Sequence, residues 1–147
     1  MRKIARKLYR AIPFKQPAYE TLRRFLSVPE PIYRDLHFRG VIDVAVEETS
    51  FRMWHHGYQI DNEVFWSGLF GQWEGASMKV WIRAARKAQV ILDVGVNTGI
   101  YALAAKAVAP LASVVAFEPV ERIRENSVPT WTEPVRSTDL ARRGVRS

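Results

Sequence analysis

The chain has 147 residues, 48% of them hydrophobic, which is the size and composition of one globular domain rather than of a disordered chain. It contains no cysteine, which excludes disulfides and thiolate metal sites and favours a reducing, cytoplasmic location. The net charge of +7 arises within residues 1–24, which hold eight basic side chains and one acidic side chain. Nucleic-acid binding needs a basic face on the folded domain, so we expect no nucleic-acid partner.

Residues 1–36 predict a basic helical arm. Along residues 1–12, apolar side chains recur on one helical face and basic side chains cover the rest. Residues 1–16 therefore either lie on the domain surface or contact an anionic membrane surface, and both interpretations stay open. Prolines then divide the arm into short pieces, and one piece predicts a helix around residues 19–26.

Residues 40–55 predict a β-hairpin. Apolar side chains occupy alternate positions in residues 41–46, a turn is expected at residues 47–50, and a second apolar run follows it. His55 and His56 are adjacent, so strand geometry directs them to opposite faces. We therefore expect both histidines to be structural and the chain to hold no metal.

Residues 61–74 are rich in aromatic side chains, which we expect to form a small core under a loop. The next segment, residues 76–89, predicts a helix with Ser77 as its N-cap. Its apolar residues recur at helical spacing and predict the buried face. They are Met78, Trp81, Ile82 and Ala85.

Residues 90–119 give the clearest structural signal, a β-α-β unit. The composition of residues 90–96 and of residues 112–119 predicts two buried strands, and residues 98–109 predict the helix between them. The strands should be parallel, with a right-handed crossover. The helix positions expected to face inward are Ile100, Leu103, Ala104 and Ala107.

Acidic residues and glycines follow both predicted strands, at the edge where α/β sheets bind ligands. Asp93, Gly95 and Gly99 surround the first turn, and Glu118 follows the second strand. Glycine permits a tight turn and a close approach of a ligand to the main chain, and the helix start offers unpaired N–H groups. Glu118 lies nineteen residues after Gly99, where an acid can accept hydrogen bonds from ribose hydroxyls.

Two nucleoside cofactors use such a unit, and the residues favour one of them. A dinucleotide site needs G-x-G-x-x-G to seat a diphosphate, but this turn has Asn97 in place of the central glycine. The Asp93 carboxylate would also repel phosphate. S-adenosylmethionine has no phosphate and bears a sulfonium and an ammonium group. The residues therefore favour S-adenosylmethionine, with a dinucleotide oxidoreductase or a unit without ligand as alternatives.

The segment "ILDVGVNTGIYAL" followed by "VVAFEPVERI" resembles the FkbM-type S-adenosylmethionine-dependent methyltransferases. The motifs of that family read D-x-G-A-N-x-G and F-E-P, and Val96 stands here in place of the usual alanine. The upstream "DNEVFWSGLFGQWE" is also similar, and the resemblance as a whole covers roughly residues 38–123. It implies an α/β fold of partial Rossmann-like, class I methyltransferase type, with N-terminal helices and a β-hairpin before one β-α-β unit.

The same resemblance implies a site and a reaction. Glu118 would bind the ribose hydroxyls, and Glu74 matches a glutamate that the family often has ahead of its first motif. The residues that would line the methionine end and the ribose of the cofactor are Asp93, Gly95, Asn97 and Gly99. The reaction would transfer the sulfonium methyl in line to a hydroxyl oxygen of a sugar or another small metabolite. No general base can be assigned from the sequence.

Residues 124–147 have little apolar content and no period, and we expect a disordered tail. The family would continue there with further β-α units, so residues 37–123 would supply only the N-terminal part of the domain. We therefore expect a truncated methyltransferase whose first parallel strand keeps an unpaired apolar edge, with its activity an open question. The alternative is a non-catalytic fragment whose basic arm binds a membrane surface or an acidic partner.

Overall fold

The structure, a computed structural model, describes residues 15–71 and 74–118. The described part is mixed α/β, with two small sheets. Its elements are α2 (Lys15–Phe25), α3 (Glu30–Tyr33), β1 (Gly40–Val46), β2 (Thr49–His55), α4 (Gln59–Ser67), α5 (Gly75–Ala85), β3 (Val90–Val94), α6 (Ile100–Val108) and β4 (Ser113–Phe117). The predicted helix at residues 1–12, Trp73 and the predicted tail at residues 124–147 lie outside the described residues.

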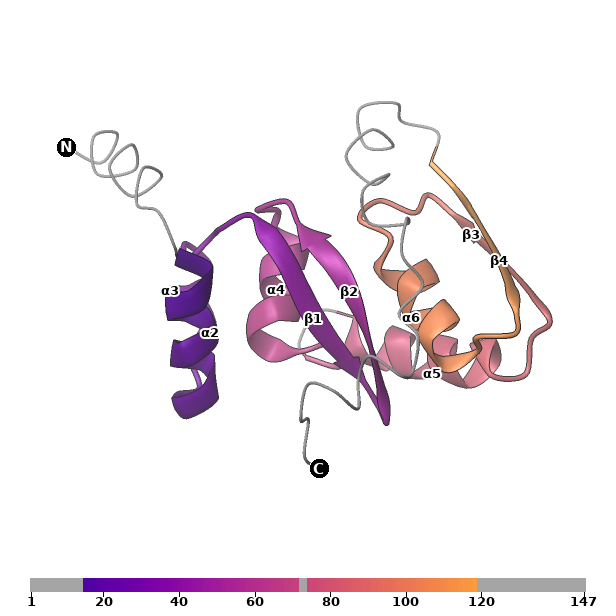
Figure 1. Ribbon diagram of the computed structural model, residues 1–147, viewed down its shortest axis with the longest axis horizontal. Helices are drawn as coiled ribbons and strands as arrows, with labels where there is room; N and C mark the ends of the chain where they lie inside the picture. The colour runs from indigo at the N-terminus through magenta and orange to yellow at the C-terminus, as the bar shows by residue number, and fades with distance from the viewer. Residues whose placement is uncertain (1–14, 72–73, 119–147) are drawn as a thin grey trace.

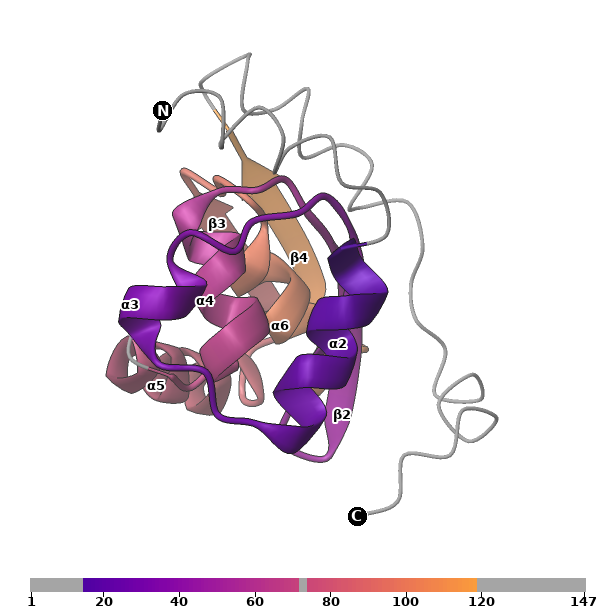
Figure 2. The ribbon, with the colours of Figure 1, turned by 90° about the vertical axis from the view of Figure 1, so that its left-hand side faces the viewer.

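Helix α6 lies between the two sheets (Figure 1; Figure 2). The antiparallel pair of β1 and β2 contacts one side of α6, and the parallel pair of β3 and β4 contacts another. Helix α5 packs beside α6, while α4 packs against β1. Helices α2 and α3 lie beyond α4, at the opposite end of the molecule from β3 and β4 (Figure 1).

The helix predicted around residues 19–26 is confirmed as α2, which already begins at Lys15. Pro17 is its third residue, where the missing N–H leaves no helical hydrogen bond unmade. The ring of Tyr19 meets the ring of Phe38 at 6.0 Å and the ring of Trp66 at 5.5 Å. These aromatic contacts hold α2 on the body of the domain.

The predicted hairpin is confirmed as β1 and β2, which pair antiparallel with Val44 opposite Phe51. Alternate side chains of β1 are buried, because successive residues of a strand point to opposite faces. The turn is shorter than predicted, since Thr49 already belongs to β2. Glu47 adopts a left-handed φ of 52° in this turn, and its carboxylate forms an ion pair with Arg86 after α5.

The expectation that the aromatic-rich segment forms a loop is wrong for its first half, which belongs to α4. The Asp61 carboxylate accepts hydrogen bonds from the backbone N–H groups of His56, at 2.8 Å, and Tyr58, at 3.3 Å. Asp61 thereby pairs backbone N–H groups at the start of the helix. This role of Asp61 could not be recognised in a segment whose most evident feature is its aromatic side chains. The expected aromatic core does form, because Phe65 is buried with its ring 4.7 Å from that of Phe38.

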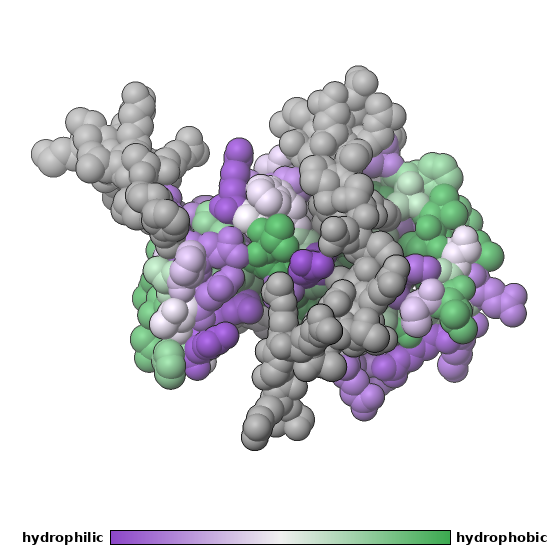
Figure 3. Space-filling view, in the orientation of Figure 1, coloured by the Kyte–Doolittle hydropathy of each residue, from purple (hydrophilic) through white to green (hydrophobic). Residues whose placement is uncertain are grey.

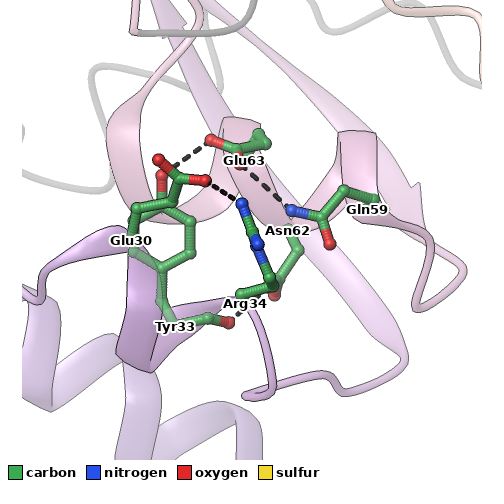
Figure 4. A network of polar contacts seen from close by, with 6 residues as sticks. All are labelled: Glu30, Tyr33, Arg34, Gln59, Asn62 and Glu63. Carbon is green, nitrogen blue, oxygen red and sulfur yellow. Dashed lines mark hydrogen bonds and ion pairs between the residues drawn. The ribbon is translucent and has the colours of Figure 1, made fainter.

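A polar network joins α3 to α4 (Figure 4). The Tyr33 hydroxyl donates to one carboxylate oxygen of Glu63 at 2.7 Å, and the Gln59 amide donates to the other at 3.1 Å. The Asn62 amide donates to the backbone carbonyl of Tyr33 at 2.5 Å. These bonds offset the cost of removing the buried Glu63 and Asn62 side chains from water.

The helix predicted at residues 76–89 is confirmed as α5, with Met78 and Ile82 buried as expected. The predicted N-cap is wrong. Glu74 occupies the cap position with a left-handed φ of 47°, and Ser77 lies inside the first turn. The Glu74 side chain makes no capping hydrogen bond to α5, so it is left to interact elsewhere.

Strands β3 and β4 pair in parallel, as the β-α-β pattern predicts, with Leu92 opposite Val115. The prediction that both strands are buried is wrong. Ile91 faces α6 and is 6% exposed, whereas Leu92 is 60% and Val94 is 76% exposed on the opposite face. The composition of a strand cannot show whether a second layer covers it. We call this exposed side the outer face; it consists of Val90, Leu92, Val94, Val115 and Phe117.

Apolar side chains gather over β3 and β4 at the right-hand end of the molecule (Figure 3). In the described part of the chain, β3 pairs only with β4, so its other edge has no ladder partner. The predicted unpaired apolar edge is therefore accompanied by an uncovered face. Exposed apolar area of this kind is uncommon on monomeric soluble domains.

Helix α6 is buried on two sides and not only on the face that was predicted to point inward. Ile100 and Ala104 are buried as expected, in the cluster formed with the hairpin. Ala105 is also fully buried, but in the second cluster, under β3 and β4. Leu103 and Ala107, expected to face inward, are only partly buried. A single inner face was predicted because the periodicity does not reveal that two sheets flank the helix.

The neighbours Ile91 and Leu92 provide a matched test of which face of β3 is covered. Ile91→Ala should lower the free energy of unfolding by about 2–4 kcal/mol, because it opens a cavity under α6. Leu92→Ala should cost less than about 1 kcal/mol, because its side chain is largely solvated already. Urea unfolding of both variants measures the difference, and equal losses would contradict the uncovered outer face.

The prediction that His55 is structural agrees with its fully buried position at the end of β2. Its ring stacks on Phe38 at 4.1 Å, and its Nδ1 accepts a hydrogen bond from the Gly57 N–H at 3.0 Å. Burial, with the nearby His37, lowers the pKa of His55 to about 4. Burial raises the pKa of Asp61 to about 6, although two backbone N–H groups favour its carboxylate.

These two pKa shifts act on stability in opposite directions. Between pH 6.5 and about 4 the unfolded chain protonates His55 and the folded chain does not, so His55 lowers stability as the pH falls. Between about pH 6 and 3.8 the folded chain keeps Asp61 protonated and the unfolded chain does not, so Asp61 raises stability as the pH falls.

Removing either group should therefore expose the effect of the other. Asp61→Asn should lose stability on acidification from pH 6.5 to 4.5 more steeply than the native chain, by up to about 1.4 kcal/mol per pH unit. His55→Gln should show the opposite change in slope. Urea unfolding at several pH values measures both slopes, and parallel pH profiles for all three proteins would refute this assignment.

Candidate functional site

The loop between β3 and α6 follows an unusual backbone path. Three of its residues, Gly95, Asn97 and Gly99, have left-handed φ angles of 83°, 50° and 84°. The N–H groups of Gly95 and Val96 donate to the carbonyl oxygen of Phe117 at 2.8 and 3.3 Å. The loop is therefore fastened to the end of β4, at the carboxyl edge of the sheet. Apart from Gly95 itself and the two residues next to it in the chain, no atom lies within 4 Å of the position that a Cβ at Gly95 would take.

Glu118 and Asn97 are brought into direct contact. The backbone N–H of Asn97 donates to a carboxylate oxygen of Glu118 at 2.9 Å, across 21 residues of sequence. This bond places an acid from the end of β4 against the turn that follows β3. The predicted proximity of the two strand ends is thus present, and Glu118 also helps to hold the strained backbone of Asn97.

Asp93 lies on β3 opposite Ala116 and is partly buried. Burial raises the pKa of the Asp93 carboxyl above its ordinary value, and the backbone N–H of Ala102, in the first turn of α6, partly offsets that rise. One of its carboxylate oxygens, Oδ2, is buried and has no hydrogen-bond partner. A buried acceptor without a donor is costly, and functional sites commonly retain such groups.

Glu74 contacts a residue that the sequence analysis did not single out. The Tyr101 hydroxyl, on α6, donates to a carboxylate oxygen of Glu74 at 2.6 Å. Trp81 of α5 fixes the tyrosine from the other side, because its ring meets that of Tyr101 edge-on at 5.5 Å and its Nε1 donates to the Tyr101 carbonyl at 2.9 Å. Tyr101 follows Ile100 in the motif, and no periodicity marks it as a site residue.

Two of the predicted site residues, Glu74 and Asp93, act on one tyrosine, Tyr101. Burial is the main cause that raises the pKa of Tyr101 to about 12, and the charges of Glu74 and Asp93 contribute. The tyrosine therefore stays neutral and able to donate. Among the described residues, the two charged groups that act on it are acids from different elements, Glu74 from the start of α5 and Asp93 from β3. Such a site suits a ligand with a positive charge.

The described residues contain no group of histidines and acids arranged to hold a metal ion. A separate cavity of about 380 Å³ lies between α2, β1 and α4, away from the loop. Its Arg23 guanidinium already donates to the Phe65 carbonyl at 2.7 Å and stacks 4.4 Å from the Phe65 ring centre. The predicted site residues Asp93, Asn97 and Glu118 lie elsewhere, at the carboxyl ends of β3 and β4 and in the loop that follows β3.

Comparison of the chain with protein-family models, with curated proteins and with solved structures finds no match. None of the described helices has both the length and the apolar character needed to cross a lipid bilayer.

A substitution series at Gly95 tests whether the left-handed backbone is required. Gly95→Ala should cost about 1–2 kcal/mol of stability even though the side chain has open space, because alanine resists a φ of 83°. Gly95→Asn should cost less, since asparagine tolerates that region better. Urea unfolding gives the order, and a greater loss for the larger asparagine would contradict a conformational cause.

Proposed function

We propose that this chain is an S-adenosylmethionine-dependent methyltransferase of FkbM type, with a Rossmann-like unit formed by β3, α6 and β4. The observation that supports it best is the hydrogen bond between Glu118 and the backbone of Asn97. It joins the two motifs of the resemblance at the carboxyl edge of a parallel sheet, where α/β folds bind nucleosides.

The electrostatics of the site favour a cationic nucleoside over a dinucleotide. A diphosphate needs positive potential, whereas the charged groups described at this turn and at Tyr101 include the carboxylates of Glu74, Asp93 and Glu118. S-adenosylmethionine has a sulfonium and an ammonium group and no phosphate. The unpartnered Oδ2 of Asp93 and the open space beside Gly95 are compatible with such a ligand.

The chain's own residues would bind and orient the cofactor. Glu118 would accept hydrogen bonds from the ribose hydroxyls, and the loop of Gly95, Asn97 and Gly99 would let the ligand approach the main chain. When bound, the cofactor supplies an electrophilic methyl group. The proposed acceptor is a hydroxyl of a sugar or another small metabolite, and catalysis would depend largely on alignment of the two reactants.

Isothermal titration with S-adenosylhomocysteine tests this function without requiring turnover. The purified chain should bind S-adenosylhomocysteine and should not bind NADH. Glu118→Gln should weaken binding about tenfold or more, because a charged acceptor for the ribose hydroxyls is replaced by a neutral one. Glu48→Gln, an equivalent change in the exposed hairpin turn, should leave the affinity unchanged.

The result that would refute the proposal is the absence of any heat of binding with S-adenosylhomocysteine from a folded chain. Tight binding of NADH instead would favour the dinucleotide alternative.

A further inference from the structure

The outer face lies at one end of the described molecule, on the side of β3 and β4 that points away from α6 (Figure 1; Figure 3). The exposed fraction of its side chains runs from 39% at Val115 to 76% at Val94. Together, its five side chains expose on the order of 500 Å² of apolar surface. Contact of this area with water is unfavourable, so an association that covers the face is favoured.

The outer face contains no charged side chain. More and less exposed positions alternate along both strands, and the more exposed ones are all apolar except Ser113. The charged residue within these two strands, Asp93, occupies a partly buried position, where the backbone N–H of Ala102 in α6 acts on its carboxyl. Two such faces can therefore stack without removing a charge from water. A charged surface would lose its hydration against this face and gain no partner.

The two ends of the parallel pair have opposite charges. At the amino end, the exposed Lys87 precedes β3, and the Lys106 ammonium donates to the carbonyl oxygen of Ala112, just before β4, at 2.9 Å. At the carboxyl end, Glu118 follows β4 directly. When two identical sheets stack, an antiparallel arrangement places the basic end of each over the acidic end of the other. A parallel arrangement would place like charges together.

We propose that the outer face is a dimerisation surface, on which a second copy of this chain stacks its own outer face about a twofold axis perpendicular to the strands. Strand β3 of one copy then lies over β3 of the second copy, in the opposite direction. Leu92, at the centre of β3, meets Leu92 of the second copy, and Val90 meets Val94. This inference does not depend on the proposed function.

The size of the outer face sets the expected strength of the dimer. Stacking of two copies removes roughly 1,000 Å² in total from water, which is near the lower limit of a specific interface. Part of that gain offsets the loss of translational and rotational freedom on association. We therefore expect a Kd on the order of micromolar.

Sedimentation velocity of the full chain at about 1 to 100 μM tests the dimer. Leu92 and Val115 face each other at the middle of the two strands, so Leu92→Lys and Val115→Lys should each raise the Kd at least about tenfold by placing a charge in the interface. Val80→Lys is the matched control, because Val80 is 66% exposed on α5, against 60% for Leu92. It should leave the Kd unchanged. Circular dichroism of each variant checks that the native fold is retained.

A single introduced cysteine tests the arrangement, because the chain has none of its own. A short bismaleimide should cross-link Leu92→Cys into a covalent dimer, since the twofold axis brings the two copies of this position together. It should not cross-link Val90→Cys, because the two copies of that position are offset by about 13 Å along the strands.

Each alternative gives a different result. A native chain that stays monomeric over this concentration range overturns the proposal, and its co-sedimentation with lipid vesicles would assign the face to a lipid surface instead. A loss of dimer in Leu92→Lys but not in Val115→Lys overturns stacking in favour of pairing between the free edges of β3. An equal loss in Val80→Lys overturns the assignment to the outer face. Equal cross-linking of Val90→Cys and Leu92→Cys overturns the antiparallel arrangement.

Discussion

The structure depends on the packing of one short helix against two sheets at once. Helix α6 fits between the hairpin and the parallel pair because its buried positions are mostly alanine, whose small side chain lets the backbones approach closely. Ala104 joins the cluster of the hairpin and Ala105 joins the cluster under β3 and β4. A larger residue at either position would push one sheet away, since protein interiors are close-packed.

The same packing positions the candidate site. The start of α6 fixes where the β3–α6 loop must turn, and the pairing of β3 with β4 brings Glu118 to the backbone of Asn97. The contact between α5 and α6 brings Glu74 to Tyr101. Two of the three non-glycine residues with left-handed backbone in the described chain, Glu74 and Asn97, belong to this site. Backbone strain is thus concentrated where polar groups converge.

Much of the local structure could be predicted from the sequence, because it depends on neighbours along the chain. The alternation of apolar side chains predicted the hairpin. The parallel β-α-β unit was predicted from an aliphatic run followed by a glycine turn and an alanine-rich segment. Helix ends were less predictable. Ser77 has the right chemistry for an N-cap, yet the packing of α5 placed Glu74 there, and the aromatic content of α4 concealed the role of Asp61 at its start.

The sequence by itself determined how the strands pair. It also determined which polar residues and glycines stand at the carboxyl ends of β3 and β4, because these follow from residue type and spacing. They are Asp93, Gly95, Asn97, Gly99 and Glu118. Only the tertiary structure decided which faces are covered. Leu92 and Ile91 are equally apolar, and α6 buries one while nothing in the described chain covers the other. It also decided that Tyr101 contacts Glu74. Their hydrogen bond spans 27 residues of sequence, so it depends on how α5 and α6 pack and not on any local pattern.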